Sequence, residues 1–442
     1  MALPGLLFEQ APPVSVPLRF LLTAPWFAVL AAGLLLWAGP DGLGSRWTPA
    51  LLGVTHLLTL GFMAMVMLGA LFQILPVVGG VPVPHPRIVA AIVHPALTLG
   101  ALSLASGLAL GLHWAIRAAL ALLAAAFLVF LASAGRSLLR GNLRDPALRT
   151  IGLALIGLLL TTSLGAVLAS AFGWSFAPPL IRITALHAAW GLLGWTLLLV
   201  AGVAQQVVPM FQATPPYPRW LARGFAPTLL AMLLAWSAAK WLTLELLAAA
   251  LALPILAAAA TFALVTLWVQ LRSRRPRQDP TARFWRFGML CLLAASIVGA
   301  SAQLQRWSDH PALPLMLGVL GIVGFALSVI SGMLYKIVPF LLWLKLQRRL
   351  GGRPPHIKQI LPDRHARLQL WLHTAATLTL LAAGIGQNGL IYPGAALLSG
   401  SALTLGVSLL AAWRRSAHAV RDSQPHRAPA QSGRRAWREL KP

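Results

Sequence analysis

The feature that most constrains this chain is a series of twelve long apolar runs separated by short polar loops. The runs lie near residues 20–38, 49–78, 88–112, 115–135, 149–172, 181–210, 222–240, 243–270, 284–304, 312–344, 368–386 and 390–412. They match the roughly 20 residues with which a helix crosses a bilayer and are too long for strands of a membrane barrel. Only 10% of the 442 residues are charged, and the mean hydropathy is +0.77. We therefore predict an all-α integral membrane protein with twelve transmembrane helices.

The basic residues predict the orientation of these helices. The formal net charge is +26, but the lysines and arginines lie in short loops between apolar runs, which argues against a nucleic-acid partner. With both termini cytoplasmic, the opposite loops carry five of the 35 basic residues, namely Arg46, Arg117, Arg182, Lys240 and Arg306. The N-terminal segment lacks a signal-peptide pattern, so Phe20 onward is expected to be a retained first span. We expect a multi-pass protein of the bacterial cytoplasmic (inner) membrane, with the lipid bilayer as its partner.

An internal repeat relates the second, sixth and tenth predicted helices. The sequences GFMAMVMLGALFQILP, GWTLLLVAGVAQQVVP and GFALSVISGMLYKIVP all fit the pattern G-(F/W)-x6-G-x3-(Q/K)-x2-P. The matching residues are Gly61, Gly69, Gln73 and Pro76; Gly194, Gly202, Gln206 and Pro209; and Gly324, Gly332, Lys336 and Pro339. Self-similarity at a fixed period indicates duplication. We predict a single membrane domain, residues 1–412, built from three four-helix units at about 20–135, 149–270 and 284–412, followed by a basic, disordered cytoplasmic tail at 413–442.

The repeated motif places small and polar residues on one helix face. At about 100° per residue, both glycines, the polar residue and the proline of each copy share that face. Glycines let a second helix, or a flat ligand, approach the backbone closely, and the proline kinks the span. The motif thus predicts either a helix-packing seam repeated three times or the wall of a pore.

The second predicted helix carries a family resemblance. Its segment THLLTLGFMAMVMLGALFQILP is similar to the span of NnrS-type proteins that reads H-x4-G-F-x6-G-x6-P, here His56, Gly61, Phe62, Gly69 and Pro76. Twelve spans with a threefold repeat also resemble the catalytic subunit of the haem-copper oxidase superfamily. The resemblance implies haem as the cofactor, with copper as a weaker expectation. It also implies that His56 takes the place of a low-spin haem ligand and His187 that of a metal-site histidine.

The chain departs from the oxidase pattern at several ligand positions. The seventh predicted helix has no adjacent histidine pair, the tenth has no histidine, and no His-x3-Tyr follows His187. A complete oxidase or reductase is therefore not expected. NnrS-type proteins resemble the oxidases, lack their full site and are associated with haem and nitric oxide stress. The resemblance thus implies a haem-associated protein in nitric oxide or respiratory redox stress, with respiratory-chain components as candidate partners.

Four residues are candidate cofactor ligands: His56, His187, Met316 and His310. An ionisable side chain within a span is costly and usually functional, and imidazole is a common haem ligand. The alternative for each histidine is a hydrogen bond to a neighbouring helix. His187 lies about 20° from its repeat glycine and His56 about 140° from its own, so the two are not expected to share one metal. Met316 and His310 lie at comparable depth and are candidates for the second axial ligand.

The remaining polar residues of the predicted spans suggest other functions. Glu245 is expected to pair with Lys240 at the membrane interface, and His94 and His373 to make helix-packing contacts. Lys336 is expected either to reach the cytoplasmic headgroups or to join Gln73 and Gln206 in a polar ring around a pore. The alternative function is a permease for a small neutral solute, and a third is an assembly partner of a respiratory complex.

Overall fold

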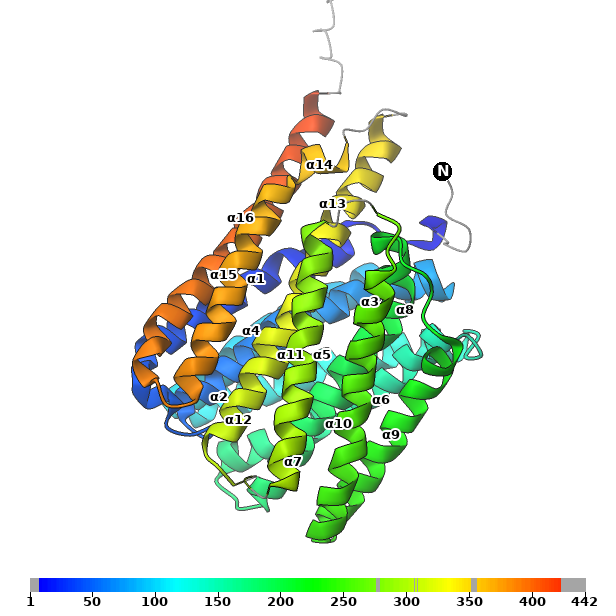
Figure 1. Ribbon diagram of the computed structural model, residues 1–442. Coiled ribbons are helices and arrows are strands. Elements are labelled where there is room, and N and C mark those ends of the chain that lie inside the picture. Colours follow the sequence, from blue (N-terminus) through cyan, green and yellow to red (C-terminus); the bar gives the residue numbers. More distant parts are fainter. Residues whose placement is uncertain (1–7, 276–278, 306, 308, 351–355, 423–442) are drawn as a thin grey trace, which may run out of the picture.

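The computed structural model describes residues 8–422 except 276–278, 306, 308 and 351–355, and these residues form a bundle of long helices without strands (Figure 1). The long helical elements are α1 (Ser15–Ala38), α2 (Pro49–His56), η3 (Leu57–Ala64), α3 (Met65–Gly79), α4 (Pro86–Leu110), α5 (His113–Leu139), α6 (Pro146–Trp174), α7 (Leu180–Ala189), η4 (Trp190–Leu197), α8 (Leu198–Gln212), α9 (Arg219–Trp241), α10 (Glu245–Leu271), α11 (Pro280–Leu304), α12 (Ala312–Gly318), η5 (Val319–Leu327), α13 (Ser328–Leu350), α15 (Asp363–Gly384) and α16 (Ile391–Asp422). Short turns complete the bundle: η1 (Phe8–Gln10), η2 (Gly39–Leu43), α14 (Ile357–Ile360) and η6 (Asn388–Leu390).

Each predicted span corresponds to a helix, and eleven of these helices are long and apolar enough to cross a membrane. The predicted span at 368–386 corresponds to α15, which is not among the eleven and carries Arg367, Gln369 and His373. It nevertheless packs along α16 and against α11. Helix α16 runs to Asp422, beyond the predicted domain boundary at 412, and residues 423–442 of the predicted tail lie outside the described residues.

Three of the helices are more buried than the others. We call the continuous helices at 49–79, 180–212 and 312–350 the central helices. Their most apolar windows are 72%, 56% and 61% buried, whereas no other span exceeds 50%. The second, sixth and tenth predicted helices, which carry the repeated motif, are therefore the most buried of the eleven candidate spans.

Each central helix contains a π-helical segment at the same place in the repeat. The segments are η3, η4 and η5, and they contain Gly61, Gly194 and Gly324, respectively. A π-turn has i→i+5 hydrogen bonds and so takes more residues than an α-turn, which rotates the following side chains away from their α-helical positions. Such segments are rare and are frequent at functional sites.

Three of the motif glycines are packing positions between a central helix and the long helix that precedes it in the chain. A Cβ at Gly69 would lie 2.6 Å from Phe20 Cβ of α1, and one at Gly332 would lie 2.8 Å from Phe284 Cβ of α11. A Cβ at Gly202 would lie 3.1 Å from Thr150 of α6. Close approach of helices is favourable in lipid, where packing rather than hydrophobic burial drives association. This arrangement supports the packing-seam interpretation of the motif.

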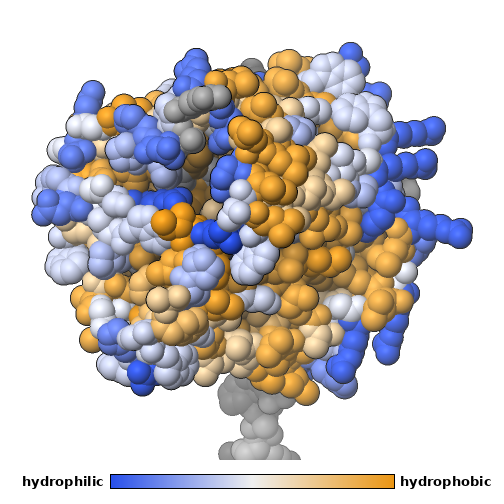
Figure 2. Space-filling view, turned by 90° about the horizontal axis from the view of Figure 1, so that it is seen from below, coloured by the Kyte–Doolittle hydropathy of each residue, from blue (hydrophilic) through white to orange (hydrophobic). Residues whose placement is uncertain are grey.

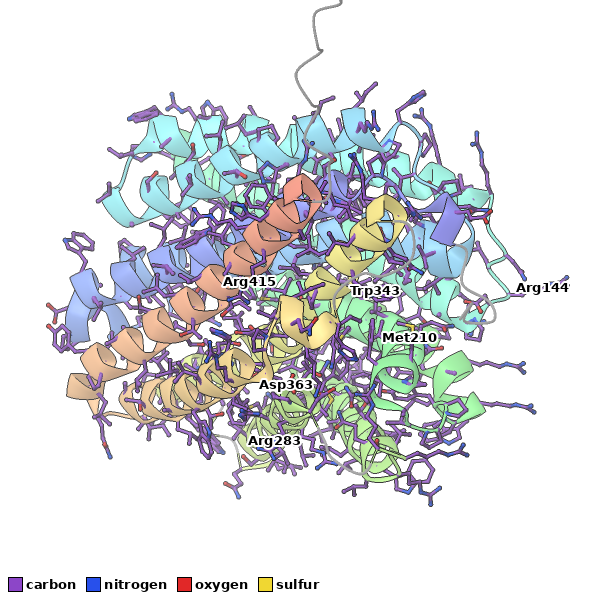
Figure 3. The ribbon with its side chains drawn as sticks, turned by 90° about the horizontal axis from the view of Figure 1, so that it is seen from above. Arg144, Met210, Arg283, Trp343, Asp363 and Arg415 are labelled. Atoms are coloured by element: carbon purple, nitrogen blue, oxygen red, sulfur yellow. The ribbon has the colours of Figure 1, made fainter. Side chains whose placement is uncertain are left out.

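The two ends of the bundle differ in composition. Helix α14 and the C-terminal ends of α13 and α16 lie at one end, and the described chain begins toward the same end (Figure 1). Figure 3 looks down on this end and shows Arg144, Arg283 and Arg415, which come from distant parts of the chain. From below, apolar residues cover a broad area with hydrophilic residues gathered on either side (Figure 2). Large apolar side chains exposed on α5 and α10, such as Leu128 and Leu246, suit contact with hydrocarbon.

Candidate cofactor-binding site

A cavity of about 710 Å³ lies among the central helices. All three π-helical segments line it, together with parts of α2, α5, α6, α7 and α12. Its walls are mostly leucine, alanine and phenylalanine side chains. The polar lining consists of hydroxyl groups, two histidines and one arginine: Thr55, Thr59, Thr161, Thr162, Ser163, Thr184, Thr196, Ser296, His56, His187 and Arg46. Such a mainly apolar cavity with a few convergent polar groups is typical of cofactor and ligand sites.

The structure brings His56 and His187 together in this cavity. Their ring centroids are 6.3 Å apart, and the ring planes are inclined at 22°. His56 Nδ1 lies 2.8 Å from the Leu52 carbonyl oxygen, and His187 Nδ1 lies 3.0 Å from the Thr161 carbonyl oxygen. Because a carbonyl only accepts, each Nδ1 carries the proton and each Nε2 keeps its lone pair. Neither Nε2 has a hydrogen-bond partner among the described residues.

Local helix geometry positions the two rings. His56 is the last residue of α2, and η3 begins at the next residue. His187 lies on α7, three residues before Trp190, where η4 begins. Opposite His187, Gly165 of α6 leaves space for the ring, since a Cβ at this glycine would lie 2.9 Å from His187 Cε1. Close packing of α6 against the sixth predicted span therefore fixes the position of His187.

From their helical phases the two histidines are not expected to share one metal, yet the structure places their ring centroids 6.3 Å apart. That expectation used the angle of each histidine from its own repeat glycine at α-helical pitch. The π-helical segments fall between these residues and change the pitch. No sequence signal specified this contact.

The other candidate ligands lie away from the pair. Met316 is half-buried on α12 and is not among the residues that line the cavity, although Leu315 and Leu317 are. His310 is exposed, and its Nδ1 accepts a hydrogen bond from the Ala312 backbone N–H at 3.2 Å. The structure therefore does not bring either residue next to His56.

One arginine lines the cavity near the start of the first central helix. Arg46 lies in the loop between η2 and α2, and its guanidinium carbon is 4.9 Å from the centroid of the Trp47 ring. Both side chains are half-buried and both line the cavity. Burial lowers the pKa of Arg46 from its ordinary value, but an arginine remains protonated in proteins. The described residues give Arg46 no carboxylate partner, so this end of the cavity carries a positive charge that can attract an anionic group.

Two histidines make the packing contacts that were expected. His94 Nε2 lies 3.0 Å from Thr23 Oγ1 of α1, and its ring meets Phe20 edge-on. His373 is buried on α15, with its Nε2 2.8 Å from Ser328 Oγ. Both rings are held by neighbouring helices and neither lines the cavity.

The polar residues of the repeated motif do not form a ring. Lys336 Nζ lies 2.6 Å from Asp279 Oδ2, an ion pair that the sequence did not predict. Asp279 also caps α11 by accepting a hydrogen bond from the Ala282 N–H at 3.2 Å. No hydrogen bond joins Gln73, Gln206 and Lys336 in the described part of the chain, and none of the six motif glycines lines the cavity. The expected pair of Lys240 and Glu245 is present, at 2.5 Å.

Among the residues that the structure describes, two histidines line the cavity. Within the described residues, no three or more histidine, cysteine, aspartate or glutamate side chains gather as a metal centre. Cys291, the single cysteine, is buried against Gly324. A site with two imidazoles suits a metal ion whose remaining ligands come from its own macrocycle.

These features define a multi-pass helical membrane protein with a large cavity between its central helices. Its fold is similar to that of a haem-copper terminal oxidase whose dimer was determined by cryo-electron microscopy. The TM-score is 0.58, and the similarity covers 94% of this chain and 84% of that chain at 12% sequence identity, so the likeness concerns the fold. No protein-family model matches the chain, and no curated protein matches its sequence.

Proposed function

We propose that this chain is a haem-associated membrane protein of NnrS-like type, in which His56 and His187 would hold one haem. The observation that carries the proposal is that both histidines line one apolar cavity with their Nδ1 atoms bound to carbonyls, while neither Nε2 atom has a hydrogen-bond partner among the described residues. Metal-bound histidines commonly donate their second ring N–H to a carbonyl, which orients the ring.

The spacing of the two rings fits this role. Two metal–nitrogen bonds of about 2 Å each, together with the distance from each nitrogen to its ring centre, are compatible with the 6.3 Å between the centroids. The apolar walls suit a macrocycle. Arg46 supplies a charge for the carboxylates of the propionates, since arginine pairs with carboxylates in a planar, two-point geometry.

A haem in this site would supply one-electron redox chemistry. The protein's own contribution is to hold two neutral imidazoles, to exclude water with leucine side chains and to orient the carboxylates through Arg46. We assign the protein to nitric oxide or respiratory redox stress, as the NnrS-like resemblance implies. Because the sequence departs from the oxidase ligand pattern, we do not assign it a complete oxidase or reductase activity, and copper is the less favoured metal.

The proposal includes the arrangement of the chain in the membrane. We propose twelve spans, with α15 as the span that completes a threefold repeat of four-helix units. The π-helical segments and the glycine contacts with α1, α6 and α11 recur in each unit and support this repeat. The basic residues at the end shown in Figure 3 support cytoplasmic termini in the bacterial inner membrane.

Visible absorption spectroscopy tests the proposal. The protein is expressed with haem supplementation, purified in detergent and measured in the oxidised and reduced states. A stoichiometric Soret band with the sharp reduced-state bands of a six-coordinate haem is the expected result. Purified protein without a Soret band would overturn the proposal.

The second candidate function is a permease for a small neutral solute. It is favoured by the cavity of about 710 Å³, in which threonine and serine hydroxyls are the main uncharged polar groups. Absence of bound haem together with solute uptake by proteoliposomes would support this function.

A further inference from the structure

The cavity has exposed lining residues mainly on one side of the bundle. They are Ala124 and Leu128 of α5, Leu159, Ser163 and Phe172 of α6, and Ala188 of α7. Leu128 is 64% exposed and Leu159 is 47% exposed, so both side chains border the cavity and the outer surface. The exposed positions of α5 and α6 repeat at an interval of four residues, so they form one stripe along each helix.

Helices α5 and α6 are neighbours and are held together at both ends. At one end, His113 Nδ1 lies 2.7 Å from the Phe172 carbonyl oxygen, and Arg117 Nε donates to the Gly173 carbonyl oxygen at 2.8 Å. At the other end a short loop joins the helices, and Leu138 packs near Gly152. The exposed lining residues between these ends, Ala124 to Leu128 on α5 and Leu159 to Ser163 on α6, lie at comparable depth, because the helices are antiparallel and rise 1.5 Å per residue.

We call the stretch of exposed lining residues between α5 and α6 the opening. Its chemistry matches the bilayer interior. Ala124, Leu128 and Leu159 are apolar, and Ser163 is its only hydroxyl. An opening of this kind at mid-depth faces hydrocarbon, where an apolar ligand concentrates and a charged solute does not. By contrast, the cavity end at Arg46 and Trp47 carries a positive charge and lies beside a loop.

We propose that haem reaches its site sideways from the bilayer, through the opening between α5 and α6, and that Arg46 receives its carboxylates at the far end of the path. This inference rests on the proposed haem site. Haem suits this path because its macrocycle is apolar and flat, whereas its carboxylates match the single guanidinium in the cavity.

Loading kinetics test the opening. Full-length protein expressed without haem is placed in phosphatidylcholine vesicles that contain haem, and the rise of the Soret band is followed. Ala124→Trp is expected to slow loading about tenfold or more, equivalent to a barrier increase of about 1.4 kcal/mol. Ala125→Trp is the matched control, because Ala125 is also exposed on α5 but does not line the cavity. This control is expected to load at the wild-type rate.

A reversible chemical modification distinguishes a blocked opening from a misfolded protein. Ala124→Cys is modified with a benzyl methanethiosulfonate reagent, which is expected to slow loading, and dithiothreitol is expected to restore the wild-type rate. Ala125→Cys receives the same treatment. Cys291 is buried and is not expected to react.

Three outcomes are decisive. A wild-type protein that never develops a Soret band contradicts the proposed function itself. A Soret band that develops equally fast in wild type and in all Ala124 variants leaves the haem site intact and overturns the lateral path. Slower loading in Arg46→Gln with unchanged Ala124 variants would also overturn it, because haem would then enter beside the loop.

Discussion

The imidazole rings of His56 and His187 lie 6.3 Å apart across the cavity, although they are 131 residues apart in the sequence. Each ring is oriented by a backbone carbonyl, that of Leu52 on its own helix for His56 and that of Thr161 on α6 for His187. The side chains therefore do not depend on one another for their orientation. This independence makes the contribution of each histidine separately measurable.

Removing either histidine of the pair should alter the bound haem. His56→Ala and His187→Ala are each expected to abolish or sharply shift the Soret band and to lower haem content about tenfold or more, or by about 1.4 kcal/mol in binding. Purified variants are compared by absorption spectroscopy at equal protein concentration. His94→Ala is the control, because His94 packs on Thr23 outside the cavity, and its spectrum should match wild type. Equal loss in all three variants would indicate a folding defect instead.

Substitution of Gly165, which lies opposite His187, should shift the His187 ring without removing this ligand. A Cβ at Gly165 would lie 2.9 Å from His187 Cε1, so Gly165→Ala must displace the ring. We expect a shifted Soret band with haem still bound. Gly152→Ala on the same helix is the control, since its Cβ would meet Leu138 at an ordinary 3.8 Å. An unchanged spectrum for Gly165→Ala would show that His187 does not ligate the iron.

An added methyl group should lower the stability of the protein at Gly69 but not at Gly33. Gly69→Ala puts a Cβ 2.6 Å from Phe20 Cβ and is expected to cost about 1–3 kcal/mol of stability through overpacking. Gly33→Ala has nothing within 4 Å and is expected to be neutral or stabilising by up to about 1 kcal/mol. Thermal unfolding of both variants in the same detergent measures the difference. Equal unfolding temperatures would contradict the close contact of the central helix with α1.

The orientation in the membrane can be measured by labelling. Asn142 lies in the exposed loop between α5 and α6, and Gln387 lies in the exposed loop between α15 and α16. In right-side-out vesicles, an impermeant maleimide should label Gln387→Cys and not Asn142→Cys, since the basic loops are expected in the cytoplasm. The reverse pattern would place the termini outside.

Acid should weaken the capping of α11. Burial raises the pKa of Asp279, but Lys336, Thr281 and the Ala282 N–H outweigh it and hold this pKa below its ordinary value. A carboxyl with a lowered pKa in the folded state stabilises it above the unfolded-state pKa of about 4, and this contribution is lost as the pH falls through the folded-state value. Asp279→Asn is expected to lose about 1–3 kcal/mol at neutral pH.

The unfolding temperature of Asp279→Asn should accordingly vary less than that of wild type between neutral pH and about pH 3. Measurements in one detergent at matched ionic strength give this comparison. A wild-type protein whose stability falls no more steeply with acid than that of the variant would contradict a stabilising role for ionised Asp279.

Two residues of the candidate site could be predicted from the sequence, but their relative geometry could not. His56 and His187 stood out because imidazoles are costly inside apolar helices. Met316 and His310 were chosen on depth alone, which does not specify the face of the helix, and neither reaches the cavity. The expectation that His56 and His187 do not share one metal assumed α-helical pitch, whereas π-helical segments follow both residues.

Local chemistry explains which features the sequence determined by itself. Apolar runs must become helices in lipid because their backbone groups have no water to bond, and glycines spaced along one face must become a contact seam or a site wall. Tertiary structure decided which helix meets each seam, that Lys336 pairs with Asp279, and that His56 and His187 face one cavity. These contacts depend on the rotation of each helix about its own axis. That rotation is set by side-chain packing between helices far apart in the chain, which no single helix encodes.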